Sequence, residues 1–374
     1  MEAERIRGYN NSIEEPRYKG FVTHKLSDIL IIVQCAVMCG LDGLEDIEEY
    51  GKNKRDWLKE VLGIERTPSD STLSRVLNLV NPDVVVNCVV EMMKEQLGTS
   101  GEQIALDGKT ICASAAEMTK QEKLHIVTMY MTDNGVILGQ KAVPDKTNEI
   151  PVVRELLELF NLAGKVITAD AMHCNRETAE KIIKCGGDYV LALKGNQQIT
   201  HEEIALYIED CVADPSIEVE KAKTVEINRD RIETRTCYKA LTLDWFAGKE
   251  EWSGLKAAYS IRREVERKGE KTLEIAYFIS SLDAPPARIL SLVRNHWKIE
   301  SMHWMLDVDY GEDDCRLLNP SGHQLMNILR KNAIALHRNF IAAMPQKTKP
   351  SVVIHMLRSL ICDDTLRAVL DFAL

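Results

Sequence analysis

The spacing of the apolar residues changes near Gly101, and this change separates two kinds of secondary structure along the chain. Before Gly101, apolar residues recur every three or four positions in 26–41 and 73–93, as on one face of a helix. After it, short apolar runs are bounded by turn residues, which is typical of strands. We therefore expect a helical N-terminal region followed by a core that contains a sheet.

Within this core, the expected strands alternate with expected helices. Such alternation is the pattern of crossover connections and indicates an α/β fold with a mixed sheet. Asp133-Asn134-Gly135 is a hairpin signal between two of the strands. The expected strands lie at 104–106, 126–131, 136–143, 166–169 and 189–193, and the expected helices at 152–160 and 176–184.

From about residue 214 to 283 the chain becomes charged and strand-like, which suggests an inserted β subdomain. Strands are expected at 225–227 and 231–238, joined by a turn at 228–230. Pro285 and Pro286 then open a long helix that reaches about residue 306. The predicted domains are a helical N-terminal domain at 1–98, a first part of the core at 99–213, a β-rich insertion at 214–284, a last part of the core at 285–345 and a C-terminal helical tail at 346–374.

The composition limits where the protein works and what it binds. The apolar run at 29–41 is shorter than the roughly 20 residues that cross a bilayer, and the first fifteen residues are too charged for a secretory signal. We therefore expect a cytoplasmic protein with no membrane partner.

Ten cysteines without a Cys-x-x-Cys pair argue against a zinc site. The net charge of −10 disfavours a DNA-coated surface, yet 316–361 holds seven basic residues and no acidic one, either as a solvated helix face or as a surface for a polyanion.

Two acidic residues stand where predicted strands end. Asp107 ends the strand that begins at 104, and Asp170 ends the strand at 166–169. Neighbouring parallel strands bring their carboxyl ends to one edge of a sheet, so these side chains can lie close together. A shared Mg²⁺ would remove their repulsion, because hard divalent cations prefer carboxylate oxygen. The alternatives are local roles, as a turn residue at Asp107 and a helix cap at Asp170.

The long helix carries a third carboxylate in an unusual stripe. His296, Glu300, His303 and Asp307 follow one another at spacings of four, three and four, so they share one helical face. The spacing is not that of a His-Glu-x-x-His zinc protease. A solvated face with internal ion pairs is the alternative to a functional site.

Motifs across most of the chain are similar to those of the DDE transposases of bacterial insertion sequences, specifically the ISAs-type or H-repeat-associated group. Many blocks in one order make this resemblance specific. The blocks are His24-Lys-Leu-Ser-Asp-Ile-Leu, Gly43-Leu-Glu-Asp-Ile-Glu, Asp107-Gly-Lys-Thr, Lys146-Thr-Asn-Glu-Ile, Thr168-Ala-Asp-Ala-Met-His, Gly187-Asp-Tyr, Lys194-Gly-Asn-Gln, Asn295-His-Trp-Lys-Ile-Glu, His303-Trp-Met-Leu-Asp-Val and Glu312-Asp-Asp-Cys-Arg.

The resemblance implies a ribonuclease-H-like core with a β-rich insertion and a helical N-terminal domain. It implies that Asp107, Asp170 and Glu300 are catalytic and bind two Mg²⁺ ions, for which Mn²⁺ can substitute. His303, Asp307 and His173 are candidates to support these ligands.

The DNA contacts are predicted from basic residues near the strand ends and in the insertion. Arg231 and Arg235 alternate with Glu233 along one strand, so both arginines face the same side, where they contact either DNA phosphates or acidic residues of a neighbouring strand. For lysines the alternative is an ordinary surface position. The candidates are Lys109, Lys194, Arg231, Arg235 and Arg316.

The resulting hypothesis is a DNA transposase that cuts at insertion-sequence ends and transfers the strands into target DNA. Its partners would be the terminal repeats, the target DNA and further copies of the chain, as a homodimer or higher oligomer when two ends are synapsed. It would be cytoplasmic and nucleoid-associated. The alternatives are a decayed or repurposed DNA-binding regulator without catalysis, and a stand-alone ribonuclease-H-like nuclease.

Overall fold

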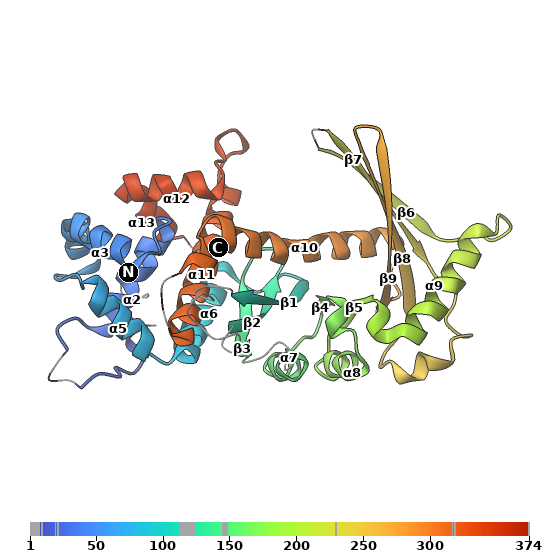
Figure 1. Ribbon diagram of the computed structural model, residues 1–374, viewed down its shortest axis with the longest axis horizontal. Coiled ribbons are helices and arrows are strands. Elements are labelled where there is room, and N and C mark those ends of the chain that lie inside the picture. Colours follow the sequence, from blue (N-terminus) through green and yellow to red (C-terminus); the bar gives the residue numbers. More distant parts are fainter. Residues whose placement is uncertain are drawn as a thin grey trace. The chain divides into compact units, whose positions relative to one another are not determined.

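The computed structural model describes residues 8, 10–18, 20, 22–111, 124–143, 149–228, 230–315, 317 and 319–372 (Figure 1). The chain forms two compact units. Unit 1 comprises Met1–Ser100, Gly108–Glu149 and Glu300–Leu374, and unit 2 comprises Gly101–Asp107 and Ile150–Ile299. The boundaries pass through one strand and two helices, so these three elements contribute residues to both units.

Unit 1 contains a bundle of helices from both ends of the chain. The helix α11 packs against α2, α5 and α6. Ser69 caps α5 by accepting from the Thr72 backbone N–H, and Asn81 caps α6 ahead of Pro82. The helical N-terminal region is thereby confirmed. The helices of this unit are α2 (Leu26–Met38), α3 (Leu44–Asn53), α4 (Arg55–Leu62), α5 (Asp70–Leu79), α6 (Pro82–Leu97), α11 (Pro320–Ala343), α12 (Val352–Ile361) and α13 (Asp363–Leu370).

No single helix in the described part of the chain is both long and apolar enough to cross a membrane. The bent pair Asp70–Leu79 and Pro82–Leu97 meets the length and composition criteria only when its two helices are taken together.

Two buried histidines join α11 to α12 in unit 1. The Nε2 atom of His337 lies 2.8 Å from the Met38 carbonyl oxygen, to which it donates, so its Nδ1 accepts from Nδ1 of His355 at 2.8 Å. Burial lowers the pKa of His337 to about 4. Both rings are therefore neutral at pH 7, and protonating His337 would break this arrangement.

We expect acid to destabilise unit 1 through His337. The unfolded state protonates near pH 6.5 and the folded state only near pH 4, so the free energy of unfolding falls as the pH drops between these values. The expected loss from His337 is about 3 kcal/mol at 1.36 kcal/mol per pKa unit. Urea unfolding at pH 7 and pH 4.5 measures it. A His337→Gln variant should show a flatter pH profile, and an equally steep profile in that variant would contradict the assignment.

Unit 1 also contains an antiparallel hairpin and the second half of a shared strand. The hairpin consists of β2 (Leu124–Met131) and β3 (Ile137–Val143), and the strand order is β3–β2–β1. Its turn contains Gly135 at φ +75°, which confirms the expected hairpin signal. Lys331 of α11 holds the hairpin by donating to Thr128 at 2.8 Å and to Gln140 at 2.9 Å.

Unit 2 is built on a mixed sheet with the strand order β1–β4–β5–β9–β8–β7–β6. The strands β1, β4 and β5 are parallel, and the remaining pairs are antiparallel. The strands are β1 (Gln103–Ile111), β4 (Val166–Ala169), β5 (Asp188–Leu193), β6 (Lys221–Asn228), β7 (Arg231–Lys239), β8 (Ala257–Arg267) and β9 (Glu270–Ser280). The helices are α7 (Glu149–Glu158), α8 (Arg176–Lys184), α9 (Gln198–Ala213) and α10 (Pro286–Val308). The first residue of α7, Glu149, and the part of α10 from Glu300 onward belong to unit 1.

These observations confirm the predicted α/β fold with a mixed sheet. The parallel strands of unit 2 are connected through helices, as the alternating pattern predicts, and β6 to β9 form the expected β-rich insertion (Figure 1). The long strands β8 and β9 and the helix α9 are elements that the sequence reasoning did not identify. Arg229, in the expected turn, and Lys146-Thr-Asn of the motif that ends in Glu149-Ile lie outside the described residues.

Candidate active site

Asp107 and Asp170 lie side by side on two adjacent parallel strands, β1 and β4, in unit 2. The expectation that a strand ends at Asp107 was wrong, because β1 also pairs with β2 and continues past this residue to Ile111, whereas Asp170 directly follows β4. The register pairs Leu106 of β1 with Ala169 of β4, and each aspartate is the next residue along the chain. Asp107 is buried, whereas the Asp170 side chain is 57% exposed at the start of a short 3-10 helix, η3 (Ala171–His173). Asp170 makes no side-chain cap hydrogen bond to this helix, so the local role considered for it is not what the structure shows.

His296 of α10 lies against this pair of aspartates. Its Nδ1 lies 3.1 Å from the Thr168 hydroxyl, and its Nε2 lies 3.9 Å from Oδ1 of Asp170. The Thr168 hydroxyl donates to the Ile104 carbonyl oxygen, so it accepts from Nδ1–H of His296. The Nε2 lone pair therefore faces Asp170.

Burial lowers the pKa of His296 below its ordinary value, while the charges of Asp170 and Asp107 act in the opposite direction. The ring is thus neutral near pH 7 and retains an unprotonated nitrogen. Sequence reasoning placed His296 on the acidic helix face but did not select it as a site residue. The available signal was its spacing of four residues from Glu300, one helical turn.

A glutamine on β1 connects the helix to the strands. Nε2 of Gln103 donates to the Thr168 hydroxyl at 3.0 Å and to the Leu292 carbonyl oxygen of α10 at 2.7 Å. These bonds hold α10 one turn before His296. They explain why a polar side chain is buried within an apolar strand.

Glu300 follows His296 by one turn on α10, which runs without a break from Pro286 to Val308. Residues four apart share one helical face, so Glu300 and His296 project from the same side of α10. Glu300 is exposed, and His303 is buried. Glu300 and His303 can offer ligand atoms within 4.8 Å of each other.

The remaining candidates for a supporting role differ in their surroundings. Asp307 is 41% exposed and binds Lys109, whose Nζ lies 2.5 Å from its Oδ1. His173 is fully buried in η3 and contributes to the lowered pKa of His296.

Gly108 follows Asp107 and faces the opposite side of β1, where it lies over a buried pair. His125 Nε2 is 2.8 Å from Oε2 of Glu149, and both side chains are at most 2% exposed. A Cβ at Gly108 would meet Oε1 of Glu149 and Nε2 of His125, and would lie 2.8 Å from the Glu149 Cδ. A larger residue at position 108 would therefore displace His125 or Glu149.

We therefore expect Gly108→Ala to lower the free energy of unfolding by about 2 kcal/mol, because the buried pair must shift or lose its contact. Urea unfolding followed by circular dichroism measures the change. Gly195→Ala is the control, since a Cβ there meets nothing within 4 Å. Equal stability of the two variants would show that the His125 and Glu149 side chains move aside freely.

The residues predicted to contact DNA lie in contrasting environments. Lys194 is exposed directly after β5, whereas Lys109 is 9% exposed and lies between Asp307 and Glu312. Arg231 and Arg235 both bind Glu233, which is 1% exposed and also binds Nε of Arg263 at 2.6 Å. The cross-strand pair considered as the alternative is present for Arg235, which also binds Glu226 of β6, whereas the pair between Arg231 and Glu233 lies within β7. Arg316 lies outside the described residues.

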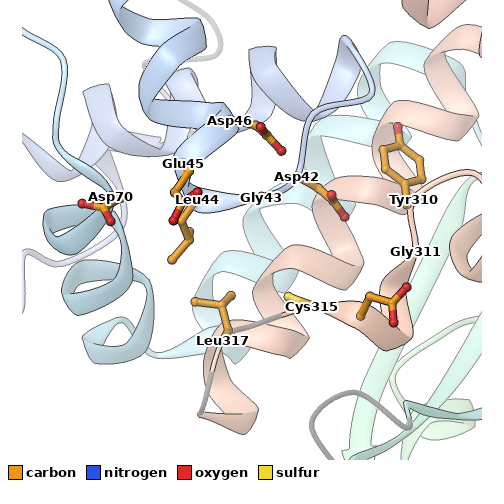
Figure 2. A pocket seen from close by; sticks show the side chains of 11 residues that line it. Asp42, Gly43, Leu44, Glu45, Asp46, Asp70, Tyr310, Gly311, Cys315 and Leu317 are labelled. Carbon is orange, nitrogen blue, oxygen red and sulfur yellow. The ribbon is translucent and has the colours of Figure 1, made fainter.

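Unit 1 also contains a cavity of about 450 Å³ with an acidic lining. Figure 2 shows the lining carboxylates of Asp42, Asp46 and Asp70, which belong to the N-terminal helices and the loop before α3. Glu45 and Asp314 add two further carboxylates to the lining. Such a lining repels phosphate, so this cavity is a poor site for a nucleic acid.

Comparisons with known proteins agree with the resemblance seen in the sequence. A family model described as "Transposase DDE domain" matches residues 99–336, and one described as "DDE_Tnp_1-associated" matches residues 10–93. The chain is 35% identical over 346 residues to "Putative transposase YncI" of Escherichia coli O157:H7, covering 91% of this chain and 88% of that protein. It is 32% identical over 368 residues to "H repeat-associated putative transposase YhhI" of Escherichia coli K12, covering 94% and 96%.

Among solved structures, a piggyBac transposase synaptic complex with hairpin DNA aligns with a TM-score of 0.45 and 11% identity. The alignment covers 98% of this chain and 78% of that chain. At this TM-score the alignment establishes neither fold nor function for this chain.

Proposed function

Because the chain belongs to the family of transposases with a DDE domain, we propose that it cuts DNA at the ends of its own insertion sequence and joins those ends to target DNA. The observation that carries the proposal is the β1–β4 register, which aligns Asp107 with Asp170 beside a neutral His296. Glu300, one turn further along α10, supplies the third carboxylate.

The donor set fits divalent metal ions. Carboxylate oxygens are the ligands that Mg²⁺ and Mn²⁺ prefer, and two adjacent carboxylates repel each other without a cation. Asp107, Asp170 and Glu300 would hold two Mg²⁺ ions, with Mn²⁺ as a substitute. Bound there, the ions would lower the pKa of a water molecule and stabilise charge on the attacking and leaving oxygens of the phosphodiester.

Side chains of the protein itself would hold the proposed metal ligands in place. Gln103 and Thr168 hold His296 and the start of the acidic helix face against β1 and β4. His296 keeps an unprotonated nitrogen directed at Asp170 without adding positive charge. His173, His303 and Asp307 would orient the ligands from their positions in η3 and on α10.

The proposed reaction needs DNA and more than one copy of the chain. Its substrates would be the terminal repeats and the target DNA, and two ends would be brought together by a homodimer or a higher oligomer. The reaction would take place in the cytoplasm at the nucleoid. We also propose that the domain ranges follow the sequence prediction, with the ribonuclease-H-like core at 99–213 and 285–345 interrupted by the insertion.

The decisive experiment follows labelled DNA that spans the junctions of the protein's own gene. Nicking and strand joining would be assayed with Mg²⁺ or EDTA for the wild type and for Asp107→Ala. Metal-dependent cuts at one defined position that the variant cannot make support the proposal. Cutting without joining would identify a stand-alone nuclease, and binding without cutting would identify a regulator that lacks catalysis.

The insertion provides a further prediction about DNA contacts. If Arg231 and Arg235 bind phosphates, the Arg231→Ala/Arg235→Ala variant should bind DNA more weakly and reduce the slope of log affinity against log salt by about 2. Fluorescence anisotropy over a salt series measures the slope, with Lys184→Ala on the exposed face of α8 as the control. An unchanged slope would leave both arginines with a structural role at Glu233 alone.

A further inference from the structure

Lys109 links two of the elements that carry the proposed metal ligands. It lies on β1, and its Nζ is 2.5 Å from Oδ1 of Asp307 on α10 and 3.3 Å from Oε2 of Glu312. Glu312 begins the short 3-10 helix η6 (Glu312–Asp314). All three residues belong to unit 1. A single ammonium group thus joins the strand, the long helix and the segment that follows the helix.

Glu312 is a fixed anchor for this lysine. Its side chain is 0% exposed, and Oε1 accepts from Nδ2 of Asn327 at 2.9 Å and from Nη1 of Arg330 at 3.3 Å. Arg330 is itself buried and binds Asp42 through Nε at 3.0 Å and Nη2 at 2.8 Å. Burial alone would raise the pKa of Glu312, but Arg330 and Lys109 hold it below its ordinary value. Glu312 is therefore ionised at pH 7.

These contacts make Lys109 a poor phosphate ligand. Turning the ammonium toward DNA would break its pair with Glu312 and remove one of the positive charges that compensate this buried carboxylate. Burial alone would lower the pKa of Lys109, but Glu312 and Asp307 together raise it, so the lysine stays charged and paired.

The spacing of residues along β1 and along α10 shows where Lys109 and Asp307 lie on the two elements that carry proposed metal ligands. Lys109 follows Asp107 by two residues, so both side chains project from the same face of β1, about 7 Å apart along the strand. Asp307 follows Glu300 by seven residues, close to two full turns, so both project from nearly the same side of α10, about 10 Å apart along its axis. Within unit 1, the Lys109–Asp307 pair therefore fastens the side of α10 that bears Glu300 to β1.

We propose that Lys109 is a positioning residue whose ion pairs with Asp307 and Glu312 hold α10 and the segment after it against β1 within unit 1, and thereby orient Glu300 for metal binding. This role rests on the proposed function, since it requires that Glu300 binds the metal ions. It replaces the expected contact between Lys109 and a DNA phosphate.

The test measures Mn²⁺ binding directly, by electron paramagnetic resonance of free Mn²⁺ titrated with the full-length protein. Lys109→Met should weaken Mn²⁺ binding by about tenfold or more, the range typical of groups that orient metal ligands. Lys109→Arg retains the charge and should recover most of the affinity. Asp307→Asn, at a more exposed position, should weaken binding in the same direction and covers the case in which Lys109→Met does not fold.

Two controls separate the possible outcomes. Lys52→Met removes an exposed lysine that also bridges two carboxylates, Glu48 and Glu49, and should leave Mn²⁺ binding unchanged. Glu300→Gln tests the metal site itself, and unchanged Mn²⁺ binding in that variant would overturn the proposed function. Weaker binding in Glu300→Gln but wild-type binding in both folded Lys109→Met and Asp307→Asn would overturn the positioning role alone.

A salt series with end DNA distinguishes the positioning role from a phosphate contact. The positioning role leaves the slope of log DNA affinity against log salt unchanged in Lys109→Met. A slope smaller by about 1, together with normal Mn²⁺ binding, would identify Lys109 as a phosphate ligand and contradict the proposal.

Discussion

Glu300→Gln is expected to reduce metal-dependent cleavage by on the order of 10³-fold, a loss of about 4 kcal/mol of transition-state stabilisation. The amide is nearly the same size as the carboxylate but carries no charge, so it is a far weaker ligand for a hard cation. Glu300 is exposed on α10, so the fold should tolerate the change. End-DNA binding should remain close to that of the wild type.

The measurement is single-turnover cleavage of labelled end DNA in Mg²⁺, together with a binding assay in EDTA. Glu95→Gln is a matched control, because Glu95 is also an exposed glutamate on a helix, α6. It should cleave at the wild-type rate. Normal cleavage by Glu300→Gln would remove Glu300 from the proposed site, and loss of both cleavage and binding would point to a misfolded variant.

Arg330→Met is expected to be the most destabilising of the substitutions considered, with a loss of about 4 kcal/mol in the free energy of unfolding. The side chain is 0% exposed and binds Asp42 and Glu312. Methionine has a similar length but no charge, so it leaves the fully buried Glu312 with fewer compensating partners. An uncompensated buried charge costs more free energy than the loss of the ion pair itself.

Urea unfolding at pH 7 measures this effect. The control is Arg367→Met, which removes an arginine of α13 that is 61% exposed and binds Asp371, the residue directly after this helix. An exposed pair of this kind contributes at most about 1 kcal/mol. If both variants unfold at the same urea concentration, the buried ion pairs of Arg330 do not stabilise unit 1 more than the exposed pair of Arg367 does.

Local periodicity and turn residues were enough to predict much of the secondary structure. The helix expected at 176–184 corresponds to α8, the strand at 166–169 to β4, and the turn at Asp133-Asn134-Gly135 joins β2 and β3. These elements have a clear apolar pattern over a few residues, and local sterics determine turns. The same reasoning placed Asp107 and Asp170 on neighbouring parallel strands, as the β1–β4 register shows, but it ended the first strand too early, since β1 continues to Ile111.

Elements with weak local patterns were not predicted. The strands β8 and β9 carry many charged and exposed residues, so apolar alternation is lost along much of their length. They pair along their whole length and extend the sheet from β5. The helix α9 exposes Ile199 and Leu206, which obscures its amphipathic pattern. In each case, contacts with distant segments compensate for a weak local preference.

The sequence by itself determined the spacing of the apolar residues, the turns, and which side chains could bind metal ions or DNA. The spacing and the turns depend only on neighbours within a few positions. The tertiary structure decided which charges meet. The sequence left Arg231 and Arg235 open to phosphates or carboxylates, and Lys109 open to a phosphate or an ordinary surface position. The packing placed all three against buried glutamates. Lys109 and Glu312 are distant in sequence, and the interaction between two charges depends on their separation in space and on the burial that excludes water, neither of which a local pattern contains.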